Sequence, residues 1–272
     1  MEAFLNFFET MPSWQKLVWI IICISANWIV ELGFPLMKLN YKKWAHAKVN
    51  LIFLGTSIAI NSLFGVLTLG IFAWLATNQF GVLHLIDLPI WAELLIAVAI
   101  LDFFAQYLVH YLLHKVAWMW RFHMVHHSDT NVDVTTATRH HPGDYVLREV
   151  FALIAILIAG IPLAYYLFYR ILTVFFAYFS HANINMPLAL DKALSYIIIT
   201  PNMHKFHHHF ERPWTDTNFG NIFSFWDRIF GTLVYGDPTK VVYGLDVLDD
   251  SRDEDVAYQF KVPFNKEIKT DY

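Results

Sequence analysis

The chain has 272 residues, of which 57% are hydrophobic and only 15% are charged. Soluble domains carry about 25% charged residues, so this composition, with a mean hydropathy of +0.42, indicates a membrane protein. The net charge of -4 provides no basic field for nucleic acid. The single cysteine, Cys23, excludes a disulfide framework or a thiolate metal site within one chain.

Apolar runs along the chain predict an all-α fold: an integral-membrane helical bundle with three spans and a helical hairpin. A spanning helix needs about 20 mostly apolar residues, and residues 17–37, 49–75 and 88–113 meet this requirement. The run at 146–180 is too long for one straight span, and a Gly-Ile-Pro break at 160–162 interrupts it. We therefore expect this run to enter the bilayer, turn and return to the same side.

Three histidine clusters follow the start of the third span. The clusters are His110 and His114; His123, His126 and His127; and His204, His207 and His208. Within each cluster, residues that are three or four positions apart lie on one face of a helix. Imidazole is a common metal ligand. A belt of interfacial histidines explains neither the repeated H-x-x-H-H spacing nor the confinement to one side. The pattern therefore predicts two metal ions, and nitrogen ligands suit iron, zinc or copper.

Two further polar residues continue the histidine pattern into the third span. Asp102 and Gln106 precede His110 at four-residue intervals, and ionisable groups inside a span usually face a functional site. Asp102 lies about 12 Å from His110 along a helix axis, too far to share an ion. We expect it to support the site indirectly or to line a substrate channel, and pairing with a polar group on another span is equally open.

The remaining histidines are weaker candidates. His46 and His84 stand alone in the sequence, and we expect both to be solvated at the membrane interface. His140 and His209 adjoin better candidates and are not expected to bind metal.

Loop charges predict the orientation. The loop after the first span contains four lysines, whereas the loop at 77–87 contains no Lys or Arg. Because cytoplasmic loops carry an excess of positive residues, we expect the N-terminus outside. A returning hairpin then unites the clusters in a cytoplasmic histidine-rich cap. The chain divides into a membrane domain at 1–236 and a charged cytoplasmic tail at 237–272.

Five segments resemble, in order and spacing, the motifs of the fatty acid hydroxylase/sterol desaturase superfamily of integral-membrane di-iron oxygenases. They lie at 102–114 (DFFAQYLVHYLLH), 121–142 (RFHMVHHSDTNVDVTTATRHHP), 180–184 (SHANI), 202–209 (NMHKFHHH) and 217–232 (TNFGNIFSFWDRIFGT). The resemblance implies two more ligands, His141 and His181. It thus implies a set of ten: His110, His114, His123, His126, His127, His141, His181, His204, His207 and His208.

The same resemblance implies an O2-dependent oxidoreductase that hydroxylates or desaturates a lipid C–H bond at a histidine-ligated di-iron centre. Its cofactors would be two iron ions, with zinc possible in purified protein, and O2 would be the co-substrate. Electrons would come from a separate protein, a ferredoxin or a cytochrome b5-like protein. Asp227 would orient a ligand histidine, and an ion pair with Arg228 is the alternative. Tyr111 stands where the family often has an arginine.

Two readings from other classes remain open. One is a non-enzymatic membrane protein that binds or transports metal, and the other is a zinc-dependent membrane hydrolase. A transporter should place its ligands along a path through the bilayer, whereas these histidines gather on one side. Oxygen consumption on adding a reductant and lipid would separate the three functions.

Overall fold

The regular secondary structure of the protein is helical. The computed structural model describes residues 1–270, and within them extended pairing is limited to two isolated bridges, Pro35 with Ile184 and Ile198 with Phe223. A π-helical turn, η2 (Phe103–Leu108), joins α4 to α5. The α-helices are α1 (Glu2–Glu9), α2 (Ser13–Gly33), α3 (Lys43–Asn78), α4 (Ile90–Asp102), α5 (Val109–Lys115), α6 (Ala117–His127), α7 (Pro142–Ala159), α8 (Leu163–His181), α9 (Leu188–Leu194), α10 (Pro201–His207), α11 (Phe225–Ile229) and α12 (Val256–Lys261).

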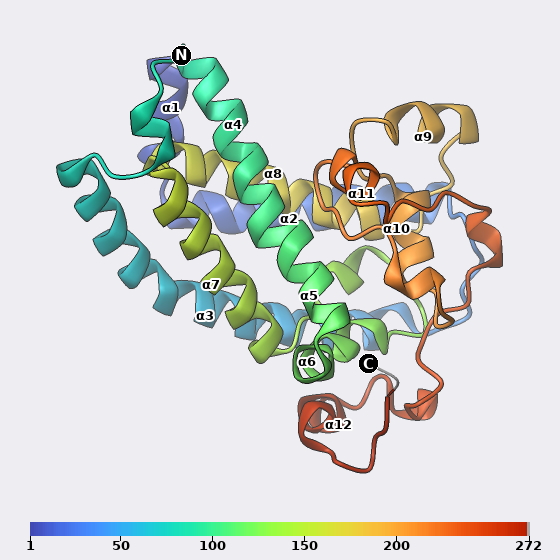
Figure 1. Cartoon of the computed structure of the whole chain (residues 1–272). Coiled ribbons are helices and arrows are strands. Elements are labelled where there is room, and N and C mark those ends of the chain that lie inside the picture. Colours follow the sequence, from blue (N-terminus) through green and yellow to red (C-terminus); the bar gives the residue numbers. More distant parts are fainter. Residues whose placement is uncertain (271–272) are drawn as a thin grey trace.

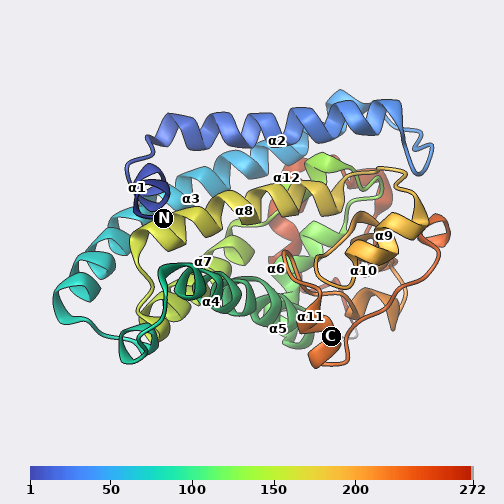
Figure 2. The same cartoon turned by 90° about the horizontal axis from the view of Figure 1, so that it is seen from above.

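The helices form a long body with a cap at one end (Figure 1). The helices α2, α3, α4, α7 and α8 run along the body, and α1 lies with the N-terminus at the end far from the cap. The shorter helices α5, α6 and α9 to α12 gather at the other end, and Figure 2 shows the same division from above. The long apolar helices are thus separated from the segments that contain the histidine clusters.

Four helical segments are long and apolar enough to cross a membrane: Ser13–Gly33, Lys43–Leu85, Ile90–Lys115 and Leu163–His181. The first three confirm the three predicted spans, and the fourth is the returning half of the predicted hairpin. Large apolar side chains on α3 face outward, and Leu63 and Val66 are 73% and 76% exposed. A large exposed apolar surface suits contact with lipid.

The hairpin of α7 and α8 turns where the sequence predicts. After α7, Gly160 adopts a φ of +69°, a left-handed conformation that glycine tolerates readily, and Pro162 precedes α8. A Cβ at Gly160 would lie 2.2 Å from the carbonyl oxygen of Phe80, so the turn packs against the loop after α3. At the opposite end, the N–H of Leu36 donates to the carbonyl of Asn183 at 3.1 Å. The hairpin therefore runs along the body and returns to the cap.

The C-terminal segment, expected only as a charged tail, packs against α6. Arg121 donates to the carbonyl of Pro263 at 2.6 Å and to that of Ile268 at 3.2 Å. Ile268 also joins a buried apolar cluster with Trp120 of the same helix. Residues 237–270 therefore contribute to the packing around a helix that carries three of the histidines.

Candidate metal centre

Nine of the ten predicted ligands come together in two groups. In each group one nitrogen of every ring lies within 4.8 Å of the others, and every side chain is buried. Nitrogens bound to one ion at about 2.1 Å lie at most about 4.2 Å apart, so each group is close to the dimensions of a coordination sphere. The first group is His110, His114, His123, His127 and His207, and the second is His126, His181, His204 and His208.

The repeated H-x-x-H-H spacing explains how two groups arise. On α6, His123 and His127 are four residues apart and share a helix face, so both join the first group, while His126 joins the second. At the end of α10 the division is reversed: the outer pair joins the second group and His207 joins the first. Each motif therefore gives a pair of histidines to one group and a single histidine to the other, which links the two groups.

The helices α5 and α8 supply the remaining grouped histidines. His110 and His114 lie four residues apart on α5 and face the first group together. His181 is the last residue of α8 and completes the second group. Between α5 and α6, Val116 has an extended backbone (φ -108°, ψ 111°) that interrupts the helix. This break allows the two helices to pack against each other and point their histidines at one centre.

Hydrogen bonds to backbone carbonyls fix the orientation of three rings. In each case Nδ1 donates: His110 to Phe219 at 2.9 Å, His181 to Ala177 at 2.7 Å and His207 to Thr217 at 2.7 Å. A carbonyl oxygen only accepts, so the ring hydrogen must be on Nδ1. Each Nε2 then presents a lone pair, which is the state that a metal ligand requires.

A carboxylate fixes a fourth ring. Nδ1 of His123 lies 2.8 Å from the carboxylate of Asp144, and both side chains are fully buried. The same carboxylate accepts a hydrogen bond from Nε of Arg148 at 2.8 Å. A carboxylate bound to the outer nitrogen of a histidine is the usual support for a metal ligand, because it sets the tautomer and the ring orientation.

Lone pairs that face one another indicate where cations fit. Nε2 of His110 lies 3.0 Å from Nε2 of His123, and Nε2 of His181 lies 3.0 Å from that of His204 and 3.2 Å from that of His126. Two lone pairs at this distance repel unless a proton or a metal ion lies between them. Burial holds the pKa of His126 and of His204 well below the ordinary value, so both rings are neutral and each keeps only one ring hydrogen. In His110 and His123 that single hydrogen is on Nδ1, so two lone pairs face each other between these two rings. Metal ions therefore fit this donor set.

The structure places His141 outside both groups. Its Nδ1 accepts the N–H of Gly143 at 3.0 Å and caps the start of α7. Its neighbour His140, which the sequence did not favour, lies closer to the centre. The ring of His140 stacks on that of His126 with 4.6 Å between centroids, and its Nδ1 lies 3.1 Å from Asp144. The position of His141 gives no support to a ligand role, and that role stays a prediction.

The two carboxylates that we expected to support the site act through a loop. Asp102 and Asp227 each accept two backbone N–H groups of the segment 219–223, at 2.8 to 3.1 Å. The carbonyl of Phe219 in this segment accepts the hydrogen bond from His110. Both carboxylates therefore hold the loop that orients His110 and contact no grouped histidine by a described hydrogen bond.

Gln106 faces a cavity rather than the histidines. Its amide donates to Thr173 at 3.2 Å and accepts from Arg148 at 3.3 Å, and it lines a cavity of about 160 Å³ together with His140. The π-helical turn η2 contains one more residue per turn than an α-helix, and such turns are frequent at functional sites. The residues of the predicted polar stripe therefore have different surroundings. Asp102 contacts a loop, Gln106 lines a cavity, and His110 and His114 join the histidine centre.

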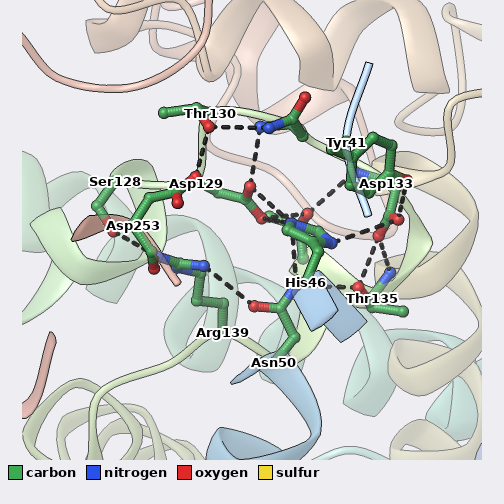
Figure 3. A network of polar contacts seen from close by, with 12 residues as sticks. Tyr41, His46, Asn50, Ser128, Asp129, Thr130, Asp133, Thr135, Arg139 and Asp253 are labelled. Carbon is green, nitrogen blue, oxygen red and sulfur yellow. Dashed lines mark hydrogen bonds and ion pairs between the residues drawn. The ribbon is translucent and has the colours of Figure 1, made fainter. Parts of the chain in front are cut away.

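The expectation of a solvated His46 is wrong, because this side chain is fully buried. Its Nε2 lies 2.8 Å and 3.0 Å from the two carboxylate oxygens of Asp129, and its Nδ1 lies 3.5 Å from Asp133. Figure 3 shows this network, in which Arg139 also hydrogen-bonds the backbone of Asp253 in the C-terminal segment. The network fixes the segment that joins α6 to α7. His84, in contrast, is exposed as expected.

The fold and the centre together define a class: a membrane protein of long apolar helices with a buried, histidine-rich centre at one end. A family model described as fatty acid hydroxylase matches residues 94–232, which is just over half of the chain and contains all nine grouped histidines. The chain therefore belongs to the fatty acid hydroxylase family, as the sequence motifs predict. With its four apolar helices, it is an integral membrane protein.

Similarity to individual proteins is confined to part of their length. The chain is 31% identical over 130 residues to the ornithine lipid hydroxylase OlsE of Rhizobium tropici and 32% identical over 143 residues to the alkylglycerol monooxygenase of Homo sapiens. It is 26% identical over 140 residues to a cholesterol 25-hydroxylase-like protein of Danio rerio. These matches cover 48%, 52% and 51% of this chain but 38%, 31% and 55% of those proteins. No solved structure matches the chain.

Proposed function

We propose that the chain is a membrane-bound, O2-dependent lipid hydroxylase that holds two iron ions in the paired histidine groups. The observation that carries this proposal is the pair of buried groups, with five and four histidines, in a chain of the fatty acid hydroxylase family. Two helices, α6 and α10, each contribute histidines to both groups. Such an arrangement suits two ions bound close together.

Iron suits this donor set because the reaction needs a metal that changes its oxidation state. Bound iron would supply the electron transfer to O2 that oxidation of a C–H bond requires. Zinc binds the same nitrogen ligands but has no redox chemistry. Divalent zinc also binds such sites more tightly than ferrous iron in general, so purified protein can carry zinc without this being the active metal.

The side chains of the protein would position the reaction and keep water away. Asp144 and the carbonyl of Phe219 hold His123 and His110 by their outer nitrogens, so those rings cannot rotate away from the centre. All nine grouped histidines are buried, and a closed site limits side reactions with water. The cavity beside His140 lies among the body helices, so a substrate from the bilayer would reach the centre from within the apolar body.

The orientation and the electron donor are part of the proposal. The four lysines at 38–48, in the loop after α2 and at the start of α3, support a cytoplasmic cap and an outside N-terminus. A cytoplasmic cap would accept electrons from a separate protein, a ferredoxin or a cytochrome b5-like protein. The charged segment at 237–270 would then also be cytoplasmic.

Three other functions share some of these features. Desaturation begins with the same abstraction of hydrogen from a C–H bond, so it is the nearest alternative. A metal transporter is disfavoured, because the grouped histidines gather at one end of the body instead of along it. A zinc hydrolase would use the same ligands but would need no O2.

Isotope labelling tests the proposal. The iron-loaded protein in a bilayer would receive an electron donor, labelled O2 and candidate lipids, including an ornithine lipid, an alkylglycerol and a sterol, the classes named for the relatives. We expect a hydroxylated product that carries oxygen from O2 and not from water. His207→Ala should lose metal and activity, whereas His84→Ala at an exposed position should keep both. A product formed without O2, or equal turnover with zinc alone, would contradict the proposal.

A further inference from the structure

A buried carboxylate on the first span holds two segments that adjoin the histidine centre. Glu31 lies near the end of α2 and is 3% exposed. Its Oε1 accepts the N–H of Asn183 at 2.6 Å and the N–H of Val134 at 2.7 Å. Val134 follows α6 and Asn183 follows α8, and each of these helices ends in a grouped histidine. One carboxylate therefore joins the ends of two helices that form the centre.

A buried lysine holds the residue next to Asn183. Lys205 directly follows His204 on α10 and is fully buried. Its ammonium donates to the carbonyl of Ala182, the residue between His181 and Asn183. The three-residue segment 181–183 is therefore held at its last N–H by the first span and at its middle carbonyl by α10.

The two anchors carry opposite charges. The negative charges of Glu31, Asp133 and Asp191 attract the ammonium of Lys205. The second oxygen of Glu31 accepts from Lys43 at 3.1 Å. An unpaired charge in a protein interior is very unfavourable, so the burial of each anchor is offset by the charges around it.

The two histidine groups are held in different ways. In the first group, a carbonyl or a carboxylate fixes three rings through Nδ1. In the second group His181 is fixed in this way, whereas Nδ1 of His126 and of His204 has no hydrogen-bond partner within residues 1–270. The second group therefore depends more on the positions of its helix ends, which are the parts that Glu31 and Lys205 hold.

We infer that Glu31 and Lys205 are positioning residues for the second group, and that together they hold segment 181–183 so that His181 faces His204. The Nε2 atoms of these two histidines lie 3.0 Å apart. This inference rests on the proposed function for the presence of two ions. Glu31 precedes residues 94–232, so the N-terminal span would support the centre from outside the region that the family model matches.

Metal titration of the full chain in nanodiscs tests the inference without turnover. Cobalt would be added to the metal-free protein, and visible absorption together with competition by a chromophoric chelator would give an affinity for each ion. His114→Ala and His208→Ala serve as references, because each removes one histidine from the first or the second group. The absorption lost in each reference identifies the signal of that group.

Two variants remove the anchors. Glu31→Leu leaves the N–H groups of Asn183 and Val134 without their acceptor, and Lys205→Met leaves the carbonyl of Ala182 without its donor. We expect each variant to weaken the ion of the second group about tenfold, the lower end of the effect of residues that orient metal ligands. The ion of the first group should be nearly unchanged. Equal weakening of both ions, or unchanged binding of both, would overturn the inference.

A conservative variant and a matched control separate positioning from a general loss of structure. Glu31→Gln keeps an oxygen acceptor for the two N–H groups, so it should restore most of the affinity that Glu31→Leu loses. Glu93→Leu removes a carboxylate of the third span that accepts from Tyr165 at 3.0 Å, and it should change neither ion. If Lys205→Met does not fold, the series at Glu31 still decides.

The double variant tests whether the two anchors act on one segment. Because either change releases segment 181–183, the combined loss of affinity should be smaller than the product of the two single losses. A full product would refute joint action. Selective weakening of the second ion without O2-dependent oxidation would leave the inference standing and refute the proposed hydroxylase. Oxidation with both ions bound equally tightly in the parent protein and the variants would do the reverse.

Discussion

The carboxylate of Asp144 is the anion with the most contacts beside the centre, and its replacement by Asn tests whether the histidine groups bind metal. It accepts from His123 at 2.8 Å and from Arg148 at 2.8 Å, and it lies 3.1 Å from Nδ1 of His140. Asn has nearly the same size but has one acceptor oxygen and one amino group. If the amide oxygen faces His123, the amino group must face the donor on Arg148, so one buried contact becomes repulsive.

The expected size of the effect follows from the role of the carboxylate. A residue that orients a metal-ligating histidine typically contributes 10–100-fold to metal affinity, which corresponds to about 1.4–2.8 kcal/mol. Asp144→Asn should therefore weaken metal binding by this factor at the group that contains His123. The second group shares no ligand with it and should change less.

Metal titration against a chromophoric chelator measures this effect, and mass spectrometry gives the number of ions bound per chain. The matched control is Asp249→Asn, because Asp249 hydrogen-bonds Ser251 at an exposed place in the C-terminal segment. If the folded Asp144→Asn variant bound two ions as tightly as the parent protein, the assignment of His123 as a ligand would be refuted.

Three further predictions address the ligand set, the pH dependence and the topology. His141→Ala should keep both ions and lose about 1 kcal/mol of stability as a helix cap; loss of an ion on metal analysis would restore His141 as a ligand. Burial lowers the pKa of His123 to about 4, while an unfolded histidine titrates near ~6.5. Its contribution to the stability of the metal-free protein is therefore complete above ~6.5 and is lost as the pH falls to about 4, and a free energy of unfolding that stays constant over this range in the metal-free protein would contradict this. After removal of Cys23, a cysteine in loop 77–87 should react with an impermeant reagent from outside and one at Asp216 should not; the opposite labelling would reverse the proposed orientation.

The helices and most of the grouped histidines could be predicted because their signals are local. Apolar runs of membrane length mark α2, α3 and α4, and the Gly-Ile-Pro break at 160–162 marks the turn between α7 and α8. Spacings of three and four residues identify histidines on one helix face. Each of these signals lies within a short stretch of chain, so the sequence alone is sufficient to recognise it.

The division of the histidines and their supports could not be predicted, because both depend on contacts between distant segments. His46 and Asp129 are 83 residues apart in sequence, and no local pattern connects them. Asp144 has a stronger local signal, since it lies at the start of a helix just after the H-H-P segment. His141 was implied by the family motif alone, and in this chain its ring caps α7 while the adjacent His140 faces the centre.

The way in which α6 and α10 divide their histidines has a consequence for assembly. Each helix gives histidines to both groups, so neither group can form completely until both helices are in place. Lone pairs that face each other in a buried site, as on Nε2 of His110 and of His123, are unfavourable without a cation between them. Metal binding at the proposed centre would therefore contribute to the stability of the cap itself, and the long apolar helices provide the body on which that cap is assembled.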